Sequence, residues 1–430
     1  MKTTLSRRKF LKLAGAAIVI APVDVVQAAR SQARTWTASG LSVPALAGFD
    51  TTVSNFMQAR NISGGALAVT RNSRLVLARG YTYTEDPQDL LVQPTSLFRI
   101  ASLSKPITAV AVLRLVQERG LSLDDKLVNR INLTPSPGQT TAAGLADVTI
   151  RDLLQHLGGW DRDSTYDPMF RDAIIADAQG VSLPISQANI LSYMTGKSMQ
   201  YTPGTTYAYS NYGYCLLGRV IEAVTGQSYL RAVNQMVWTP LSLNRPTLGR
   251  SLLRYRLRNE VKYYSQYSGA PYGRWNLNNM DAHGGWLASA VDMARLAASF
   301  DDPATSPILD SASIATMFGL PKNIPEASYT PGDEYYGCGW MVRDWGGGNR
   351  NTYHDGSLDG TYTFVVRRGF DKTNWCVMFN QRDDISGLAY NAIDDGLHVT
   401  TNAVTTWPTH NLFPEYLARA KSVYKPSVPK

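Results

Sequence analysis

Apolar residues follow two different periods in the first part of the chain. From residue 46 to residue 60 they recur with the helical period. Residues 65–84 instead alternate between apolar and polar positions, interrupted by Asn72-Ser73, a pair typical of tight turns. This pattern predicts a helix followed by a β-hairpin that turns at Asn72-Ser73.

A second helix is predicted from Ser102 to about Arg119. Gly120 follows it in the position just after a helix, where glycine is favoured because it adopts a left-handed backbone without strain. Residues 107–113 are apolar on nearly every side except at Thr108. A helix with this pattern is expected to be buried between layers.

Strand patterns nearly vanish between about residue 121 and residue 300 and return near the C-terminus. Short helices are predicted at 150–156, 211–224 and 289–299, strands at 337–345, 362–368 and 374–381, and a last helix at 414–423. Strands therefore lie at both ends of the chain, with helices between them. This order predicts an α/β (α+β) architecture, in which residues 45–125 and 301–430 build one sheet domain and residues 126–300 form an inserted helical domain. A cleft is expected between the two parts.

The first 29 residues have the order of an export signal. A basic start is followed by an apolar run from Leu13 to Val23 and by small residues around Ala28. Arg7-Arg8 within S-R-R-K-F-L-K resembles the twin-arginine signal of bacterial precursors. The apolar run is too short to span a bilayer, so we expect cleavage, a periplasmic or secreted protein, and no stable membrane span afterwards.

Charge gives no indication of a nucleic-acid partner. The segment through Ala28 carries five cations and one anion, so the net charge of +8 falls to +4 once it is removed. Basic residues are dispersed except in residues 254–275, where five cations alternate with five tyrosines and a tryptophan. The segment has two open interpretations: Arg254, Arg256, Arg258 or Arg274 could recognise a substrate carboxylate, or the segment is structural, as an aromatic-rich solvated loop or a strand with an exposed basic face.

The cysteines and histidines do not have the spacing of a metal site. The three cysteines are Cys215, Cys338 and Cys376, too few for a disulfide scaffold. The last two lie in predicted strands and either pair or remain buried thiols. The five histidines have neither the H-x-x-x-H spacing nor a carboxylate cluster beside them, so no metal or other cofactor is expected.

Ser102 and Lys105 form an S-x-x-K pattern at the start of the predicted buried helix. Residues three apart on a helix lie on one face, so the lysine amine can accept the proton of the serine hydroxyl. The unpaired amide N–H groups of the helix start would stabilise an oxyanion. The pattern occurs four times, but the other copies lie in the export signal or in the basic C-terminal tail.

Two later segments carry residues suited to the same chemistry. Tyr209 and Asn211 form the only Y-x-N of the chain: a tyrosine there can move a proton and an asparagine can bind an amide, although a helix cap explains the pair equally simply. His354, two residues before Gly356, precedes the strand predicted near residue 362. The glycine would let a substrate backbone approach, and the Ser357 N–H would face an oxyanion, whereas the segment alone resembles a hairpin turn.

Two turn segments are predicted to be structural. Residues 153–159 end one helix and residues 284–293 begin another, and each contains a Gly-Gly pair. His156 and His283 also stand two residues before a glycine, but neither adjoins a predicted strand of the sheet. We expect no chemistry from either segment.

The order of these motifs resembles the serine β-lactamase and penicillin-binding-protein superfamily. F-R-I-A-S-L-S-K, then P-G-T-T with Y-S-N, then a basic residue two positions before glycine match its landmarks in sequence, as do L-L-Q-H-L-G-G and G-G-W-L-A-S-A-V-D-M-A. The resemblance covers nearly the whole chain after the export signal and is nearest to the class C-like branch. It implies the β-lactamase/transpeptidase-like fold, an antiparallel sheet flanked by helices with an inserted all-helical domain.

The resemblance also implies roles for the site residues. Ser102 would be acylated, with Lys105 and Tyr209 as a coupled proton-handling pair whose base is not assigned to one residue. Asn211 would hold the amide of the acyl side chain. His354 and Gly356 would belong to the substrate-binding strand, and the N–H groups of Ser102 and Ser357 would form the oxyanion hole.

Departures from the family pattern narrow the substrate. Class C β-lactamases usually carry lysine where this chain has His354, so a dedicated β-lactamase is disfavoured. Histidine there, with Tyr209-Ser210-Asn211, resembles peptidases and amidases that act on D-amino acids. The alternatives are a family VIII-type carboxylesterase with weak β-lactamase activity and a penicillin-binding protein without turnover. The partner is then a small-molecule or peptide substrate, and the sequence gives no indication of oligomeric state.

Overall fold

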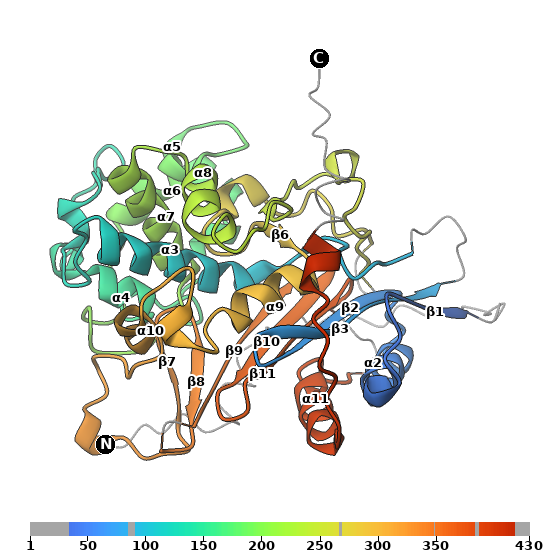
Figure 1. Ribbon diagram of the computed structural model, residues 1–430. Helices are drawn as coiled ribbons and strands as arrows, with labels where there is room; N and C mark the ends of the chain where they lie inside the picture. The colour runs from blue at the N-terminus through green and yellow to red at the C-terminus, as the bar shows by residue number, and fades with distance from the viewer. Residues whose placement is uncertain (1–33, 85–90, 266–268, 348, 383–386, 418–430) are drawn as a thin grey trace.

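The structure is a computed structural model, which describes residues 34–84, 91–265, 269–347, 349–382 and 387–417. Its centre is an eight-stranded antiparallel sheet (Figure 1) in the order β1-β3-β2-β11-β10-β9-β8-β7. The strands are β1 (Thr35–Ser39), β2 (Gly64–Arg71), β3 (Arg74–Thr84), β7 (Glu334–Tyr336), β8 (Met341–Asp344), β9 (Arg350–Leu358), β10 (Thr361–Arg368) and β11 (Thr373–Phe379). The prediction of one sheet built from both ends of the chain is confirmed, because β2 pairs directly with β11.

The predicted hairpin is β2 and β3. Asn72 and Ser73 form its turn and both adopt a left-handed backbone, with φ angles of 48° and 60°. Two consecutive left-handed residues match the right-handed twist of the flanking strands, which explains why a tight turn forms here.

Side chains of different size cover the two faces of the sheet. Leu67 and Val69 of β2 point toward helices α2 (Ala47–Ala59) and α11 (Ala392–Ala403), together with large residues of β10 and β11. The alternate residues Ala66 and Ala68 point to the other face, where their small size leaves room for helix α9. The strand alternation therefore builds a three-layer core.

The remaining helices lie between β3 and β7 in the chain, and all of them except α9 gather at one end of the sheet (Figure 1). They are α3 (Ser104–Glu118), α4 (Ile150–Leu154), α5 (Asp172–Gln179), α6 (Gln187–Thr195), α7 (Asn211–Thr225), α8 (Tyr229–Val233), α9 (Ala290–Ala298) and α10 (Ser311–Met317). The buried helix predicted after Ser102 is α3, which packs against α7, α8 and α10. Helix α9 was placed in the inserted helical segment but packs on β2, β3, β10 and β11, because its face of small residues fits the alanine face of the sheet.

The C-terminal part contains a helix that the sequence analysis missed. Helix α11 has several β-branched residues and begins with no side-chain cap, so its propensity for helix is weak. It forms because Ile393, Leu397 and Thr401 lie four residues apart and are buried against the sheet. Of the predicted helix at 414–423, the structure shows a helical turn through residue 417, and the rest lies outside the described residues.

A small second sheet links the two parts of the molecule. Its strands β4 (Phe98–Arg99), β6 (Trp286–Ala288) and β5 (Thr247–Leu248) pair in that order. The segment that leads to Ser102 is thereby fixed to the segment that precedes α9. Within the described ranges, no helix has the length and apolar content needed to cross a membrane.

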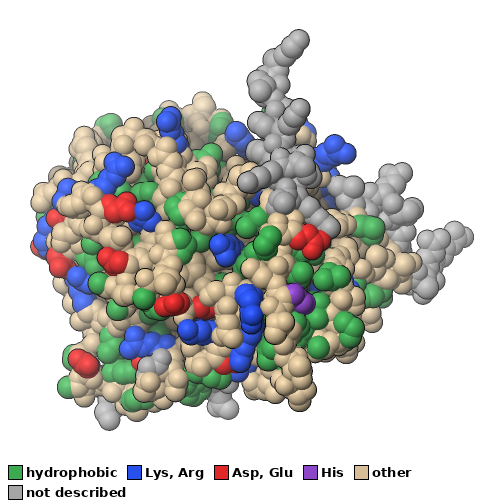
Figure 2. All heavy atoms as spheres, in the orientation of Figure 1, with side chains coloured by type: hydrophobic (Ala, Val, Ile, Leu, Met, Phe, Trp, Pro, Cys, Tyr) green, Lys and Arg blue, Asp and Glu red, His purple; other side chains and the backbone are tan. Residues whose placement is uncertain are grey.

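The surface carries charges of both signs, and the three cysteines form no disulfide bond. On the face seen in Figure 2, Lys and Arg side chains lie interspersed with Asp and Glu. Cys215, Cys338 and Cys376 are all free and buried, so the alternative of a pair between the last two does not hold.

Candidate active site

Ser102 lies on a short 3-10 turn, η2 (Ala101–Leu103), directly before α3. The helix therefore begins two residues later than predicted, at Ser104. Ala101 has a φ of 46°, a left-handed backbone that costs a non-glycine residue about 1–3 kcal/mol. The turn leaves Ser102 partly exposed while its neighbours on both sides are buried.

Hydrogen bonds from the sheet hold the chain in this strained turn. The hydroxyls of Thr361 and Thr363 on β10 donate to the carbonyl oxygens of Arg99 (2.8 Å) and Ile100 (2.9 Å). The Ile100 N–H donates to the Trp286 carbonyl oxygen at 3.0 Å. Two sheets thus position the residues just before the nucleophile.

The tyrosine- and arginine-rich segment contributes to the same support. The Arg99 guanidinium packs against the neighbouring rings of Tyr263 and Tyr272, 4.6 and 5.0 Å from their centroids, and lies 3.8 Å from Glu260. Of the arginines proposed to recognise a carboxylate, Arg256 bonds the Glu260 carbonyl oxygen and Arg274 pairs with Asp359. The buried part of this segment is therefore structural, which neither sequence interpretation anticipated.

Lys105 is fully buried beneath Ser102. Its Nζ lies 3.0 Å from Ser102 Oγ, 2.6 Å from Asn211 Oδ1 and 3.0 Å from the His283 carbonyl oxygen. Burial, followed by the charge of Arg162, lowers the pKa of Lys105 well below its ordinary value. A neutral amine at this position can accept the serine proton.

Tyr209 completes the group around the serine. Lys105 Nζ lies 4.6 Å from the centroid of the Tyr209 ring. Burial raises the pKa of Tyr209, while the Arg162 charge and the nearby Ser102 hydroxyl lower it. The predicted trio of Ser102, Lys105 and Tyr209 is thus in mutual contact in the structure.

Asn211 is held by both ends of its carboxamide. Oδ1 accepts from Lys105, and Nδ2 donates to Asp167 Oδ2 at 2.6 Å. These partners define its orientation, because an ammonium or amine donates here and a carboxylate accepts. The residue is buried at the first position of α7. Asn211 therefore binds Lys105 and Asp167 of the protein itself. The sequence-based expectation for this residue was a contact with a substrate amide.

Arg162 and Asp167 are site residues that the sequence analysis missed. The Arg162 guanidinium lies 4.4 Å from the centroid of the Tyr209 ring and 3.9 Å from Asp167. Burial raises the pKa of Asp167, whereas Arg162 and the bond from Asn211 lower it. Lys105, Asn211, Asp167, Arg162 and Tyr209 form a closed ring of contacts, which we call the charged wall. In the sequence, the position of Arg162 soon after the Gly158-Gly159 turn is a weak indication of this group.

His354 lies within a nine-residue strand, β9, and not in a turn before a strand. Its polar sequence hid this strand, which forms because β8 and β10 pair with it on both sides. His354 Nδ1 donates to the Asp355 carbonyl oxygen (2.6 Å), so Nε2 accepts from the Tyr336 hydroxyl (3.0 Å). Burial and the charge of Lys105 lower the pKa of His354 to about 3, so the ring is neutral at neutral pH.

Gly356 is required by the nucleophile's own chain. A Cβ at this position would lie 2.1 Å from the Ile100 carbonyl oxygen and 2.4 Å from Thr363 Oγ1. The sequence analysis expected a close approach by substrate. The structure shows that β9 itself approaches the segment leading to Ser102 this closely.

Ser357 can present its N–H to the site. Leu358 pairs with Thr361 across a two-residue turn, so the neighbouring Ser357 directs its N–H away from β10, by the alternation of antiparallel ladders. The pairing of β9 with β8 ends at Tyr353, which leaves that side of Ser357 without a strand partner. We call residues 354–357 of β9 the β9 wall.

Both Gly-Gly turn segments border the site, although no chemistry was expected from them. The His283 carbonyl oxygen accepts from Lys105, and His156 Nδ1 accepts from the Ser210 N–H at 3.1 Å. The His156 ring lies 4.3 Å from the ring of Tyr209 and 4.4 Å from that of Tyr336, measured between centroids. These segments therefore support the proton-handling residues.

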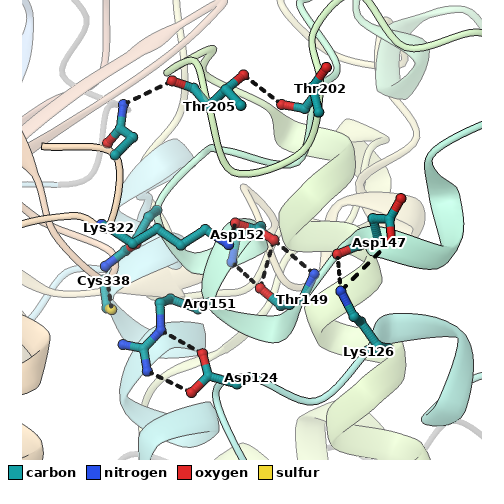
Figure 3. A network of polar contacts seen from close by, with 12 residues as sticks. Asp124, Lys126, Asp147, Thr149, Arg151, Asp152, Thr202, Thr205, Lys322 and Cys338 are labelled. Atoms are coloured by element: carbon teal, nitrogen blue, oxygen red, sulfur yellow. Dashed lines mark hydrogen bonds and ion pairs between the residues drawn. The ribbon is translucent and has the colours of Figure 1, made fainter.

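Figure 3 shows how α4 is tied to the loop before Tyr209 and to the segment at residue 322. Asp152 is buried and closes a capping box with Thr149, and Lys322 Nζ lies 2.5 Å from its second oxygen. The neighbouring Asn323 donates to the Thr205 carbonyl oxygen at 3.5 Å. Residues far apart in sequence are thus fastened together beside the site.

A pocket of about 180 Å³ adjoins the charged wall. Arg162, Asp167 and Asn211 line it, together with apolar side chains that include Trp160 and Met194. Ser102 is not among its lining residues, so the pocket lies next to the reacting atoms and not around them. In the part of the chain that the structure describes, no group of His, Cys, Asp or Glu has the arrangement of a metal site.

Comparison with known proteins shows the same family and fold. A family model described as Beta-lactamase matches residues 49–399. Protein flp of Staphylococcus aureus strain MW2 is 23% identical over 318 residues, which are 74% of this chain and 59% of that protein. The chain thus spans less than two thirds of the length of this curated relative.

Solved structures of related proteins superimpose over most of the chain. The D-amino acid amidase from Ochrobactrum anthropi SV3 is 20% identical, with a TM-score of 0.63 over 83% of this chain and 98% of the amidase. EstCE1, described as a hydrolase with promiscuous acyltransferase activity, is 18% identical, with a TM-score of 0.65 over 83% of this chain and 100% of EstCE1. At these identities the likeness shows the fold, an antiparallel sheet with flanking helices.

Proposed function

The chain belongs to the β-lactamase family of serine hydrolases, and we propose that it is an exported hydrolase that cleaves D-amino-acid peptides or amides through an acyl-enzyme at Ser102. One observation carries the mechanism. A buried lysine with a lowered pKa lies 3.0 Å from Ser102 Oγ, 2.6 Å from an asparagine oxygen and 4.6 Å from the centroid of a tyrosine ring. This arrangement activates a serine without a histidine or a metal ligand.

The reaction proceeds in two displacements. Ser102 Oγ attacks the carbonyl carbon while its proton passes to the Lys105–Tyr209 pair. The N–H groups of Ser102 and Ser357 bind the oxyanion. Collapse of the intermediate breaks the C–N bond, and the leaving amine takes the proton from the pair. Water then attacks the ester, giving the free acid and restoring Ser102.

The substrate class is supported by the neutral ring of His354 on the β9 wall. A fixed cation at position 354 would bind the carboxylate of a β-lactam. The neutral His354 ring provides no such charge. The pocket beside Asn211 offers space for the side chain of the acyl group. The fold shared with a D-amino acid amidase agrees with this proposal.

A carboxylesterase of the family VIII type, with weak β-lactamase activity, is the second candidate. Two observations favour it. The neutral ring of His354 on the β9 wall admits a neutral ester as readily as an amide. The fold is also similar to that of EstCE1. The third alternative is a penicillin-binding protein that is acylated without turnover. It differs from the first two only in deacylation.

A panel of four substrates on the purified protein tests the proposal. The panel consists of a D-amino-acid amide, a D-alanyl-D-alanine peptide, a short-chain aryl ester and a chromogenic cephalosporin. We expect the first two to be hydrolysed best and Ser102→Ala to abolish turnover, while Ser54→Ala on the distant helix α2 retains it. Hydrolysis by Ser102→Ala at the wild-type rate would refute the mechanism. A preference for the ester would favour the second candidate, and a stable adduct in mass spectra would favour the third.

Export is part of the proposal and rests on the first 29 residues alone. Replacing Arg7 and Arg8 by lysine tests the twin-arginine interpretation, because that route depends on the paired arginines. We expect the precursor of the double variant to stay in the cytoplasmic fraction of a bacterial host. Equal export of both proteins would contradict the assignment of the signal.

A further inference from the structure

The charged wall holds a cation that the proposed reaction has not yet used. Arg162 Cζ lies 4.4 Å from the centroid of the Tyr209 ring, and about one third of the arginine side chain is exposed. Asp163, 3.5 Å from the guanidinium, and Asp167, which binds Asn211 and lies 3.9 Å from it, hold the guanidinium at this position. A guanidinium over an aromatic face attracts the ring, and it attracts the ring more strongly when the phenol is ionised.

Among the residues that the structure describes, the β9 wall beside Tyr209 holds no permanent cation. The ring of His354 on the β9 wall is committed as a neutral group by its bonds to Tyr336 and to a backbone carbonyl oxygen. Lys105 lies 4.6 Å from the Tyr209 centroid, but its charge is lost when it acts as the proton acceptor. A tyrosinate formed during proton transfer would therefore depend on a cation from elsewhere.

We infer that Arg162 is a positioning residue of the reaction: its guanidinium, held over Tyr209 by Asp167, stabilises the ionised form of that tyrosine while the proton of Ser102 is transferred. This inference rests on the proposed acyl-enzyme mechanism and deepens it. Arg162 does not need to touch the substrate. It supplies from the helical side of the site the charge that the β9 wall does not hold.

The other groups that face Tyr209 do not replace this charge. The ionisable groups near it are Lys105 on α3, Asp167, Asp355 on β9 and Arg162, and the two carboxyls oppose ionisation of the phenol. The remaining neighbours are His156, His354, Tyr207, Tyr214 on α7 and Tyr336 on β7, for which burial favours the neutral form. Among these neighbours, Arg162 exerts the strongest charge effect on Tyr209.

The direction in which Arg162 shifts the pH profile follows from its effect on the pKa values of Tyr209 and Lys105. Arg162 lowers the pKa of Tyr209 and also that of Lys105, so it favours the deprotonated state of the pair. Activity rises with pH as the pair loses its proton, which gives the acid limb of the profile. Removing the charge therefore moves this limb to higher pH and leaves the rate above it little changed.

Phosphonylation of Ser102 by a neutral alkyl fluorophosphonate measures this limb without any assumption about the natural substrate. The serine oxygen forms the P–O bond, fluoride leaves, and intact-mass spectra follow the adduct from pH 5 to pH 10. We expect Arg162→Gln to move the acid limb up by about one pH unit and to slow labelling about tenfold below it. Arg162→Lys should fall between that variant and the wild type.

Arg171→Gln is the matched control, because Arg171 lies 5.7 Å from the ring of a different tyrosine, Tyr166. Its profile should match that of the wild type. An Arg162→Gln variant that is slowed by the same factor at every pH, or is not slowed, would overturn the inference. If Arg162→Gln does not fold, an unshifted limb in Arg162→Lys, with a normal melting curve, would overturn it instead. Wild-type labelling absent from Ser102 would refute the proposed mechanism itself, and the inference with it.

Discussion

The charged wall and the β9 wall meet at Ser102 but treat charge in opposite ways. On the charged wall, Lys105, Asp167 and Arg162 are joined through Asn211 and the Tyr209 ring into one set of contacts. On the β9 wall, burial favours the neutral forms of His354 and Asp355, Gly356 has no side chain, and Ser357 presents its N–H. In the proposed mechanism, activation of the serine and binding of the reacting carbonyl are therefore supplied by separate parts of the fold.

This division has a physical basis. Proton transfer needs ionisable groups whose pKa values are shifted by burial and by one another, and such groups must be packed in contact. An oxyanion hole needs rigid donors at defined positions, and backbone N–H groups of a strand provide them without the freedom of a side chain. Four tests can break or sharpen the contrast, beginning with the largest expected effect.

Replacing Lys105 by methionine should nearly abolish acylation of Ser102. The substitution removes the group 3.0 Å from Ser102 Oγ, and loss of such a base lowers rates by about 10²–10⁴-fold. Fluorophosphonate labelling at pH 8 measures the loss. Lys126→Met, at an exposed lysine that bonds the Asp147 carbonyl oxygen, is the control. Labelling of Lys105→Met within tenfold of the wild type would contradict the role of the charged wall.

On the β9 wall, Gly356→Ala should reduce activity about 100-fold without removing any ionisable group. Its Cβ would lie 2.1 Å from the Ile100 carbonyl oxygen, so β9 and the Ser102 turn must separate, and a displacement of about 1 Å has this effect on rate. The overpacking should also lower the free energy of unfolding by about 1–3 kcal/mol.

Gly48→Ala is the matched control, because its Cβ would lie at an ordinary 3.4 Å from Thr400 and it is in helix α2. Alanine there should leave activity unchanged and stabilise the helix by about 0.5–1 kcal/mol. Urea denaturation and the labelling assay measure both variants. Equal behaviour of the two alanine variants would mean that the close approach at Gly356 is not needed.

His354 of the β9 wall and Asp167 of the charged wall should contribute to stability against acid with opposite signs. The pKa of His354 is lowered to about 3, so unfolded chains bind a proton below pH 6.5 that the folded protein rejects, and stability falls as the pH decreases from 6.5 toward 3. The pKa of Asp167 is raised, so its contribution is present at low pH and is lost as the pH increases through that raised value.

His354→Gln isolates the histidine part of this pH dependence. Below pH 6.5 the free energy of unfolding of the variant should fall less steeply than that of the wild type, by at most about 1.4 kcal/mol per pH unit. Urea denaturation at pH 5 and at pH 8 gives the two slopes. Identical slopes for the two proteins would show that His354 is not held neutral by the fold.

The smallest expected effect concerns the pH profile of His354→Gln. Glutamine keeps a neutral hydrogen-bonding side chain, and the wild-type ring titrates at about 3, below the range in which activity develops. The acid limb should therefore stay in place, in contrast to its shift in Arg162→Gln. A limb that moves with His354 would place proton handling on the β9 wall and remove the distinction between the two walls.

Much of the fold was predictable because local patterns encode local elements. The period of apolar residues defined the β2–β3 hairpin, α3 and α7, and these match the structure closely. Strand β9 and helix α11 escaped because their sequences have weak intrinsic preferences and are held by neighbours. Helix α9 was recognised as a helix, but its place on the sheet depends on alanines of β2 more than 200 residues earlier.

The candidate site divides in the same way. By itself the sequence determined the order of Ser102, Lys105, Tyr209, Asn211 and His354, since short motifs with defined spacing carry that information. Only the tertiary structure decided that His354 is neutral, that Asn211 joins Lys105 to Asp167, and that Arg162 covers Tyr209. The physical reason is that a pKa and a charge contact depend on burial and on neighbours through space. Lys105 and Asn211 are 106 residues apart in the chain, so no local pattern records their contact.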